Sequence, residues 1–222
     1  PQPGWLDTLL RAWKENPNVG AVSGAMLPES DTFIQHCGQI ANFHEYLTVH
    51  NRGEREALAS FSLLVPRPTW EQSGGFCSSL RHTEDIDFSL RLKKLGWKLF
   101  FEPQAQVYHC PKRTTLSQFL SYAHESGMYS IRMRLQHPEE YFMPIFLHWG
   151  LTWKIAAPII AALRTIQIYL HTPGLWRYLY CIPWVFLHKL AWCLGAAKEL
   201  TQKESQKRVE DESHCQYGNF SS

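Results

Sequence analysis

The composition of the chain changes along its length, and this change limits the folds that it can adopt. Residues 1–112 mix apolar, polar and charged positions as soluble α/β sequences do, and residues 113–140 are polar and typical of a helix. Residues 141–197 are strongly apolar and rich in Trp and Tyr. The polar stretch 198–222 is predicted to be a disordered tail. We therefore expect an α/β domain, a helical connector and an apolar helical region, in that order.

The charge balance and the cysteines narrow the class of protein. The 222 residues include 22 Lys and Arg against 20 Asp and Glu, for a net charge of +2. A nucleic-acid surface needs a basic stripe, so we expect no nucleic-acid partner. The six cysteines are scattered with no C-x-x-C pair, and we interpret them as free thiols in a reducing compartment. A disulfide framework is the alternative, but a chain of this length does not need one.

The first part of the chain has a pattern of alternating helices and strands. Apolar residues recur at helical spacing over 5–14, and the small apolar run VGAVSGAML, 19–27, predicts a buried strand. Segments 39–49 and 59–65 are also predicted to be strands. PRPTWEQSGGF, 66–76, predicts a short helix or turn closed by a double glycine, which suits a loop with unusual backbone angles.

An acidic cluster, HTEDIDF, follows at the head of a predicted helix. Thr83 is a suitable N-cap, so Glu84, Asp85 and Asp87 fall in the first turn, where the helix dipole stabilises each acid by roughly 0.3–1 kcal/mol. Asp87 precedes Arg91 by four residues, so we interpret it as one half of a structural ion pair. A carboxylate at the mouth of an enclosed helix, below a Gly-Gly loop, also suits a raised pKa and a general-base role. Both interpretations of the cluster stay open at this point.

The order and spacing of several motifs resemble one known family. The motifs are PGWL, GAVSG, LLVPR, W-E-x-x-GGF, TEDIDFSLRL, GWK and VYH. Together they resemble the C-terminal half of a family-2 glycosyltransferase with the Rossmann-like GT-A fold, and the resemblance covers residues 1–112. It implies a partial GT-A domain, followed here by the apolar, aromatic-rich helical region.

The resemblance implies a reaction and its base. In this family the acid that ends the T-E-D motif is the general base, and Asp85 matches it. Asp85 would take the proton from an acceptor hydroxyl while that oxygen attacks a nucleotide-diphospho-sugar with inversion. Glu84 would tune the pKa of Asp85 or orient the acceptor, or it could be a surface acid that complements the helix dipole.

The resemblance also implies binding residues and a cofactor. Gly74, Gly75 and Phe76 match the family's loop beside the donor sugar and acceptor, and Thr83 joins them as a substrate-binding candidate. His109, at the end of a predicted strand, matches a metal-binding histidine that would hold Mn²⁺ or Mg²⁺ at the donor diphosphate. Without the resemblance, a histidine at a strand end is more often an ordinary polar residue.

The sequence departs from the family pattern at its start. Such enzymes carry a nucleotide-binding half and a D-x-D metal motif upstream of an element like PGWL, and neither precedes it here. We therefore expect a fragment of an active glycosyltransferase that is inactive by itself. The alternative is a non-catalytic, truncated or degenerate GT-A module that binds a membrane or a partner protein.

Two apolar segments, 141–163 and 175–195, are long enough to cross a bilayer, but prolines and charged residues interrupt them. We expect interfacial helices or a shallow hairpin, with a buried helical cap as the alternative. A protein at the cytoplasmic face of a membrane would suit a nucleotide-sugar donor and a carbohydrate or lipid-linked acceptor. In the connector, Arg132, Arg134 and His137 could line an acceptor path, but the solvated face of a helix is the favoured interpretation.

Overall fold

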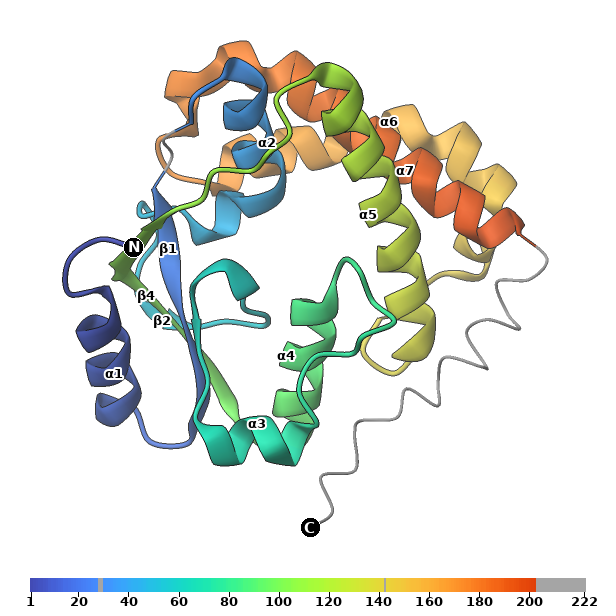
Figure 1. Cartoon of the computed structure of the whole chain (residues 1–222). Helices are drawn as coiled ribbons and strands as arrows, with labels where there is room; N and C mark the ends of the chain where they lie inside the picture. The colour runs from blue at the N-terminus through green and yellow to red at the C-terminus, as the bar shows by residue number, and fades with distance from the viewer. Residues whose placement is uncertain (28–29, 142, 203–222) are drawn as a thin grey trace.

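The computed structural model describes residues 1–27, 30–141 and 143–202, and it has the mixed α/β architecture that the sequence predicted (Figure 1). Four strands form one sheet in the order β2-β4-β1-β3. The two long strands, β1 and β4, are parallel, and the short β2 and β3 pair antiparallel with them at the two edges. The strands are β1 Val19–Leu27, β2 Gly53–Glu54, β3 Leu63–Leu64 and β4 Lys98–Tyr108.

Helices cover the sheet and then continue beyond it. The first four α-helices are interspersed with the strands, and the last three are long and follow the last strand (Figure 1). The α-helices are α1 Trp5–Glu15, α2 Phe33–Phe43, α3 Arg67–Ser73, α4 Glu84–Lys94, α5 Leu116–Gln136, α6 Gly150–His171 and α7 Ile182–Thr201. The 3₁₀ helices are η1 His44–Tyr46, η2 Ser60–Ser62, η3 Ile145–His148 and η4 Leu175–Cys181.

Both faces of the two long strands are buried under helices. Val22 pairs with Phe100, and both join a core cluster with Leu9 of α1. Their neighbours Ala21 and Leu99 belong to a different cluster, which contains Phe88 and Leu92 of α4. Successive side chains of a strand point to opposite faces, so α1 and α4 cover opposite sides of the sheet. The near-continuous apolar run of β1 follows from this double cover.

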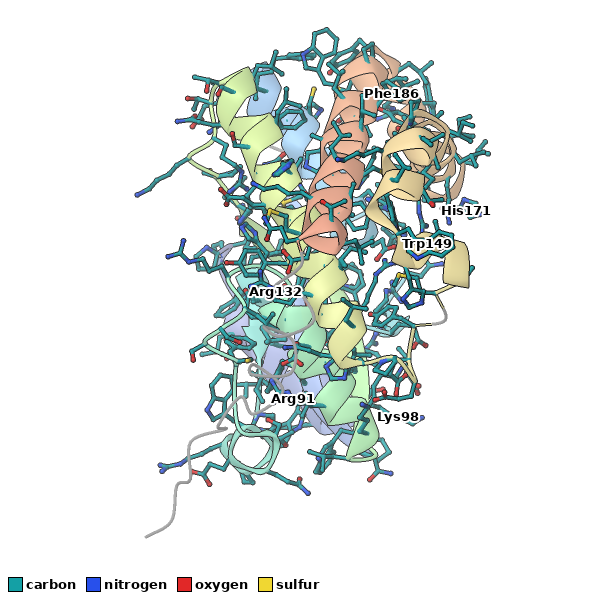
Figure 2. The ribbon with its side chains drawn as sticks, turned by 90° about the vertical axis from the view of Figure 1, so that its right-hand side faces the viewer. Arg91, Lys98, Arg132, Trp149, His171 and Phe186 are labelled. Carbon is teal, nitrogen blue, oxygen red and sulfur yellow. The ribbon has the colours of Figure 1, made fainter. Side chains whose placement is uncertain are left out.

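Helices α5, α6 and α7 pack side by side, with α7 between the other two (Figure 2). Two glycines set the contact between α5 and α7. A Cβ added at Gly127 would lie 2.0 Å from the carbonyl oxygen of Trp192, and one at Gly195 would lie 1.8 Å from that of His124. No side chain fits at such distances, so these glycines allow the two helix backbones to approach closely.

A shared core joins the helices to the sheet. Met26 near the end of β1 and Ile40 of α2 are buried in one cluster with Ile168 of α6 and Val185 of α7. This cluster has no solvent layer between its sheet and helix members, since all four residues are at most 4% exposed. The apolar C-terminal helices are therefore packed directly on the α/β part.

The connector helix α5 is tied to α7 by a buried ion pair. Nε and Nη2 of Arg132 donate to the two carboxylate oxygens of Glu199 at 3.1 and 3.2 Å, and Glu199 is fully buried. His137 is buried as well. The favoured interpretation of Arg132 and His137 as a solvated helix face is therefore wrong. Sequence periodicity could not reveal it, because the partners are distant in sequence: Glu199 of α7 for Arg132 and Asp87 of α4 for His137.

Several predicted elements are confirmed, one predicted strand is wrong, and another is shorter than predicted. Segment 39–49 is not a strand but the end of α2 and the 3₁₀ helix after it. Thr32 caps α2 by accepting a hydrogen bond from the N–H of Gln35 at 3.2 Å, a start signal that outweighs the apolar run. Of segment 59–65 only Leu63 and Leu64 pair with β1.

The predicted tail falls partly inside the structure. Helix α7 continues through Lys198 to Thr201, so the first residues of segment 198–222 are helical and Glu199 is fixed by its ion pair. Residues 203–222 lie outside the described residues.

Among the described cysteines four are free thiols, and Cys77 is disulfide-bonded, which corrects the expectation for that residue. The free thiols are Cys37, Cys110, Cys181 and Cys193.

One helical stretch, Leu175–Thr201, is long and apolar enough to cross a membrane by length and composition, and 33% of its most apolar window is buried. A single stretch of this kind is weak evidence for a span, because a core helix of a soluble protein meets the same criteria. In α7, His188 and Glu199 are fully buried, and α5 and α6 pack against the helix. The contacts of α7 with α5 and α6 account for the part of its apolar surface that is buried.

Candidate functional site

A cavity of about 480 Å³ lies between the sheet part and the long helices. It is lined by Glu84 and Asp85 at the start of α4 and by His109 after β4, which are 24 residues or more apart in sequence. The fold thus brings together three of the predicted catalytic and metal-binding residues. Its polar and charged lining consists of Asn42, His44, Glu45, Tyr46, Ser60, Arg81, His82, Thr83, Glu84, Asp85, His109, Arg113, Tyr122, Ser126, Ser130, Lys189 and Trp192.

Asp85 lies in the first turn of α4, and its carboxylate is held from a distant loop. Oδ2 accepts a hydrogen bond from the backbone N–H of Ser60 at 3.1 Å, and Oδ1 accepts one from the N–H of Ile86 at 2.9 Å. Burial raises the pKa of Asp85, and these hydrogen bonds offset only part of the increase. The result is a positioned carboxylate on the wall of a cavity with a higher proton affinity than an exposed aspartate.

Glu84 lies beside Asp85 and shares its partner. Its Oε1 is 3.5 Å from the hydroxyl of Ser60, which donates to it. Burial raises the pKa of Glu84, and the negative charge of Asp85 raises it further. Ser60 therefore contacts both carboxylates, one through its backbone and one through its side chain. Sequence reasoning missed Ser60, because no motif connects it to the T-E-D triplet.

Asp87 has a different role from its two acidic neighbours. It accepts hydrogen bonds from Nη2 of Arg91 at 2.8 Å and from Nε2 of His137 at 2.8 Å. Burial by itself would raise the pKa of Asp87, but the hydrogen bonds from His137 and Arg91 and their positive charges outweigh it and lower the pKa. The predicted structural ion pair with Arg91 is confirmed. Asp85, Ile86 and Asp87 have the D-x-D spacing, but the two carboxylates contact different partners.

Thr83 precedes α4 but does not cap it with its side chain. Its backbone is left-handed, with φ 69°, and its hydroxyl donates to the carbonyl of His82 instead of accepting from α4. The prediction of a side-chain N-cap is therefore wrong. A positive φ at a β-branched residue is strained, and the strain lies beside the candidate base on the cavity wall.

The double glycine supports α4 and does not line the cavity. Gly74 ends α3 with φ 76°, and the carbonyl of Gly75 accepts from Nη2 of Arg91 at 2.6 Å. Phe76 packs against Phe88 of α4, with ring centroids 5.1 Å apart. These three residues are absent from the described lining of the cavity, so the structure places them behind α4. Their predicted part in substrate binding stays a prediction.

His109 lies on the cavity wall directly after β4. Its ring packs against Phe43 and Phe61, with centroids 5.0 and 5.5 Å away, and its Nδ1 is buried without a hydrogen-bond partner among the described residues. Burial and the charge of Arg113 lower the pKa of His109, so the imidazole is neutral, which is the form that binds a metal. The described part of the chain contains no cluster of three or more His, Cys, Asp or Glu that could hold a metal ion. His109 could therefore supply one ligand, but these residues do not form a complete metal site.

The long helices contribute basic and aromatic groups that the sequence did not link to the site. Lys189 of α7 lines the cavity and donates from Nζ to the carbonyl of Ala41 at 2.7 Å. Burial lowers its pKa to about 8. Arg113 stacks on the ring of Tyr122, 3.7 Å from its centroid. Lys189 and Arg113, which precedes α5, therefore add two basic groups to the cavity that contains Asp85 and Glu84, which suits a polar ligand with an anionic group.

A second, more open hollow of about 580 Å³ lies elsewhere on the molecule. Tyr108, Tyr178 and Tyr180 line it, with Asp31 as its one carboxylate among the described lining residues. It has a larger volume than the first cavity, but it lacks a pair of neighbouring carboxylates. The chemistry of the acidic cluster therefore favours the smaller cavity as the candidate site.

Comparison with known proteins adds a distant relationship. The pre-mycofactocin glycosyltransferases of Mycobacterium tuberculosis strains CDC 1551 / Oshkosh and ATCC 25618 / H37Rv are each 25% identical to this chain over 150 residues. This chain is distantly related to a glycosyltransferase. The match covers 63% of the chain but only 31% of each relative. No family model and no solved structure matches the chain.

Proposed function

We propose that this chain forms the acceptor side of a family-2 glycosyltransferase of the GT-A fold, which transfers a sugar from a nucleotide-diphospho-sugar to an acceptor hydroxyl with inversion. The observation that carries the proposal is the Asp85 carboxylate, fixed by the N–H of Ser60 on the wall of a cavity and raised in pKa by burial. The distant glycosyltransferase relatives support the class of reaction. Because the match covers 31% of their length, the activity of the whole protein is part of the proposal.

The proposed step is a single displacement. Asp85 accepts the proton of the acceptor hydroxyl as that oxygen forms a bond to the anomeric carbon. The bond from the anomeric carbon to the donor phosphate breaks on the opposite face, the nucleoside diphosphate leaves with the electron pair, and the configuration inverts. A raised pKa suits this role, because a general base is most effective when its pKa lies near the working pH.

The other groups of the cavity have supporting roles in this proposal. Ser60 fixes Asp85 through its backbone N–H, and Glu84, which accepts from the Ser60 hydroxyl, orients the acceptor. A divalent cation, Mn²⁺ or Mg²⁺, would neutralise charge on the leaving diphosphate. His109 would be one of its ligands, and the others would come from the diphosphate or from groups outside the described residues. A carbohydrate or lipid-linked acceptor at the cytoplasmic face of a membrane completes the proposal.

The test is sugar transfer by the protein that carries these 222 residues, measured as nucleoside diphosphate release from a panel of nucleotide-sugars. Asp85→Asn keeps the size of the side chain but removes the base, and we expect turnover to fall about 10²- to 10⁴-fold. Asp7→Asn, at an exposed acid of α1, is the matched control and should leave turnover unchanged. Unchanged transfer by Asp85→Asn would overturn the assignment of the base. Absence of release by the wild type with every donor would overturn the proposed reaction.

A further inference from the structure

The outer face of α6 is an uninterrupted apolar stripe that nothing in the described structure covers. Its six large members recur every three or four residues, and each is between 55% and 76% exposed. They are Leu151, Ile155, Ile159, Leu163, Ile166 and Leu170. The stripe extends over the 22 residues of α6, a length of about 33 Å. Isolated exposed apolar residues are ordinary on soluble proteins, but a continuous face of this length marks an interaction surface.

The opposite face of α6 is already occupied. Trp153, Ala157, Ala161 and Ile168 are buried, and they point toward α7. In Figure 2, α6 lies at the edge of the molecule beyond α7, and Trp149 stands at its start. No residue of α6 lines the candidate cavity. The stripe therefore lies on the far side of α6 from the helical core and belongs to a different surface from the proposed active site.

The charges around the stripe indicate what would cover it. Between Glu140 and Glu199 the sequence contains no Asp or Glu, whereas it contains Lys189 and Lys198 of α7 and, outside that helix, Lys154, Arg164 and Arg177. The last three of these basic side chains are exposed. At about 100° per residue, Lys154 falls beside the stripe, beyond Leu151, whereas Arg164 falls on the side of α6 that faces α7. An apolar face with a cation beside it and no carboxylate in the surrounding segment complements a bilayer with anionic headgroups.

The helix has the features of one that lies on a membrane. A spanning helix would need a covered or lipid-compatible surface all round, but α6 carries Lys154 and Arg164 within its length and packs one face on α7. Trp149, 64% exposed directly before α6, is the type of residue that is enriched at headgroup level. An interfacial helix buries one apolar face about 5–10 Å into the boundary between headgroups and acyl chains while its basic side chains reach the phosphates.

We propose that the outer face of α6 docks in the plane of an anionic lipid bilayer, with Leu151 to Leu170 in the acyl boundary and Lys154 at the lipid phosphates. Helix α7 stays in the protein core in this arrangement and does not insert. The inference is independent of the proposed sugar transfer, because it depends only on the exposed face of α6 and its charges.

The test uses the purified 222-residue protein and sedimentation with vesicles. We expect binding to phosphatidylcholine vesicles that contain phosphatidylglycerol and weaker binding to pure phosphatidylcholine. The double variant Ile155→Glu/Ile159→Glu should lower the affinity at least about tenfold, because it places two charges in the acyl boundary. Lys154→Gln should lower binding to the anionic vesicles alone. Leu6→Glu, at an apolar residue of α1 that is 50% exposed, is the matched control and should bind as the wild type does.

Folding and self-association are measured on the same samples. The substituted side chains of α6 are exposed, so circular dichroism and the melting temperature should match the wild type. Equal vesicle binding by wild type and Ile155→Glu/Ile159→Glu would overturn the proposal. A wild-type protein that binds to none of the vesicles would also overturn it. Light scattering that shows a dimer in the wild type and a monomer in the double variant, without vesicle binding, would assign the stripe to a second copy of the chain instead.

Discussion

The backbone N–H of Ser60 donates a hydrogen bond to Oδ2 of Asp85 at 3.1 Å, across 25 positions of sequence. Ser60 opens the short 3₁₀ helix before β3, and Asp85 lies in the first turn of α4. The contact fixes the direction of the carboxylate and opposes the increase in pKa that burial causes. The candidate base is thus controlled by a residue from an edge of the sheet that no sequence motif marks.

Removing this N–H should change the pH dependence of activity. Ser60→Pro deletes the donor at a position where the preceding residue, Ala59, is already extended, as proline requires. The pKa of Asp85 should then rise further, so the acidic limb of the kcat/KM profile moves to higher pH. Ser60→Ala keeps the N–H but loses the hydroxyl contact with Glu84, and its acidic limb should move less. Identical profiles for the two variants would show that the N–H does not tune Asp85.

Asp85 should lower the stability of the folded protein at neutral pH. Its folded pKa is raised, so the folded state binds its proton more tightly than the unfolded state does, and stability falls as the pH rises through that window. We expect Asp85→Asn to raise the melting temperature by a few degrees at pH 7 and to lose this gain as the pH approaches 4. Scanning calorimetry at both pH values measures the difference. A melting temperature below that of the wild type at pH 7 would contradict the prediction.

The buried ion pair between Arg132 and Glu199 should dominate the stability of the helical part. Glu199→Ala leaves the Arg132 guanidinium without this partner in a site where Arg132 is only 7% exposed, and we expect a loss of roughly 3–5 kcal/mol in the free energy of unfolding. Urea denaturation followed by circular dichroism gives the value. Lys198→Ala, at the exposed neighbouring position, is the control and should change stability by less than about 0.5 kcal/mol.

Gly75 should resist substitution for two reasons that can be separated. Its φ is +70°, and an added Cβ would lie 2.7 Å from Cζ2 of Trp70. Gly96 has a similar φ of +86° but open space around it. We expect Gly96→Ala to cost roughly 1–2 kcal/mol from the backbone alone and Gly75→Ala to cost about 1–3 kcal/mol more. Equal urea midpoints for the two variants would mean that Trp70 moves aside without cost.

The sequence predicted the elements whose signals are local. The helix from Trp5, the strand from Val19 and the helix that begins at Glu84 all have the apolar spacing or capping composition of their type, and all three are present. The prediction of a strand over 39–49 was wrong, because a short apolar run fits a strand and a buried helix equally well. The N-cap at Thr32 favours the helix. The motif order also identified Asp85, Glu84 and His109, which the fold places on one cavity.

Only the tertiary structure decided which polar groups meet. The pairs Ser60 with Asp85, Asp87 with His137, and Arg132 with Glu199 join residues 25, 50 and 67 positions apart. Local periodicity carries no information about such contacts, since they depend on how whole helices pack. The same packing distinguished two apolar helices of similar composition, because α7 packs on both α5 and α6, whereas α6 packs on α7 with one face and leaves its outer face uncovered. The sequence by itself determined which segments are apolar, and the fold decided which of their faces remain at the surface.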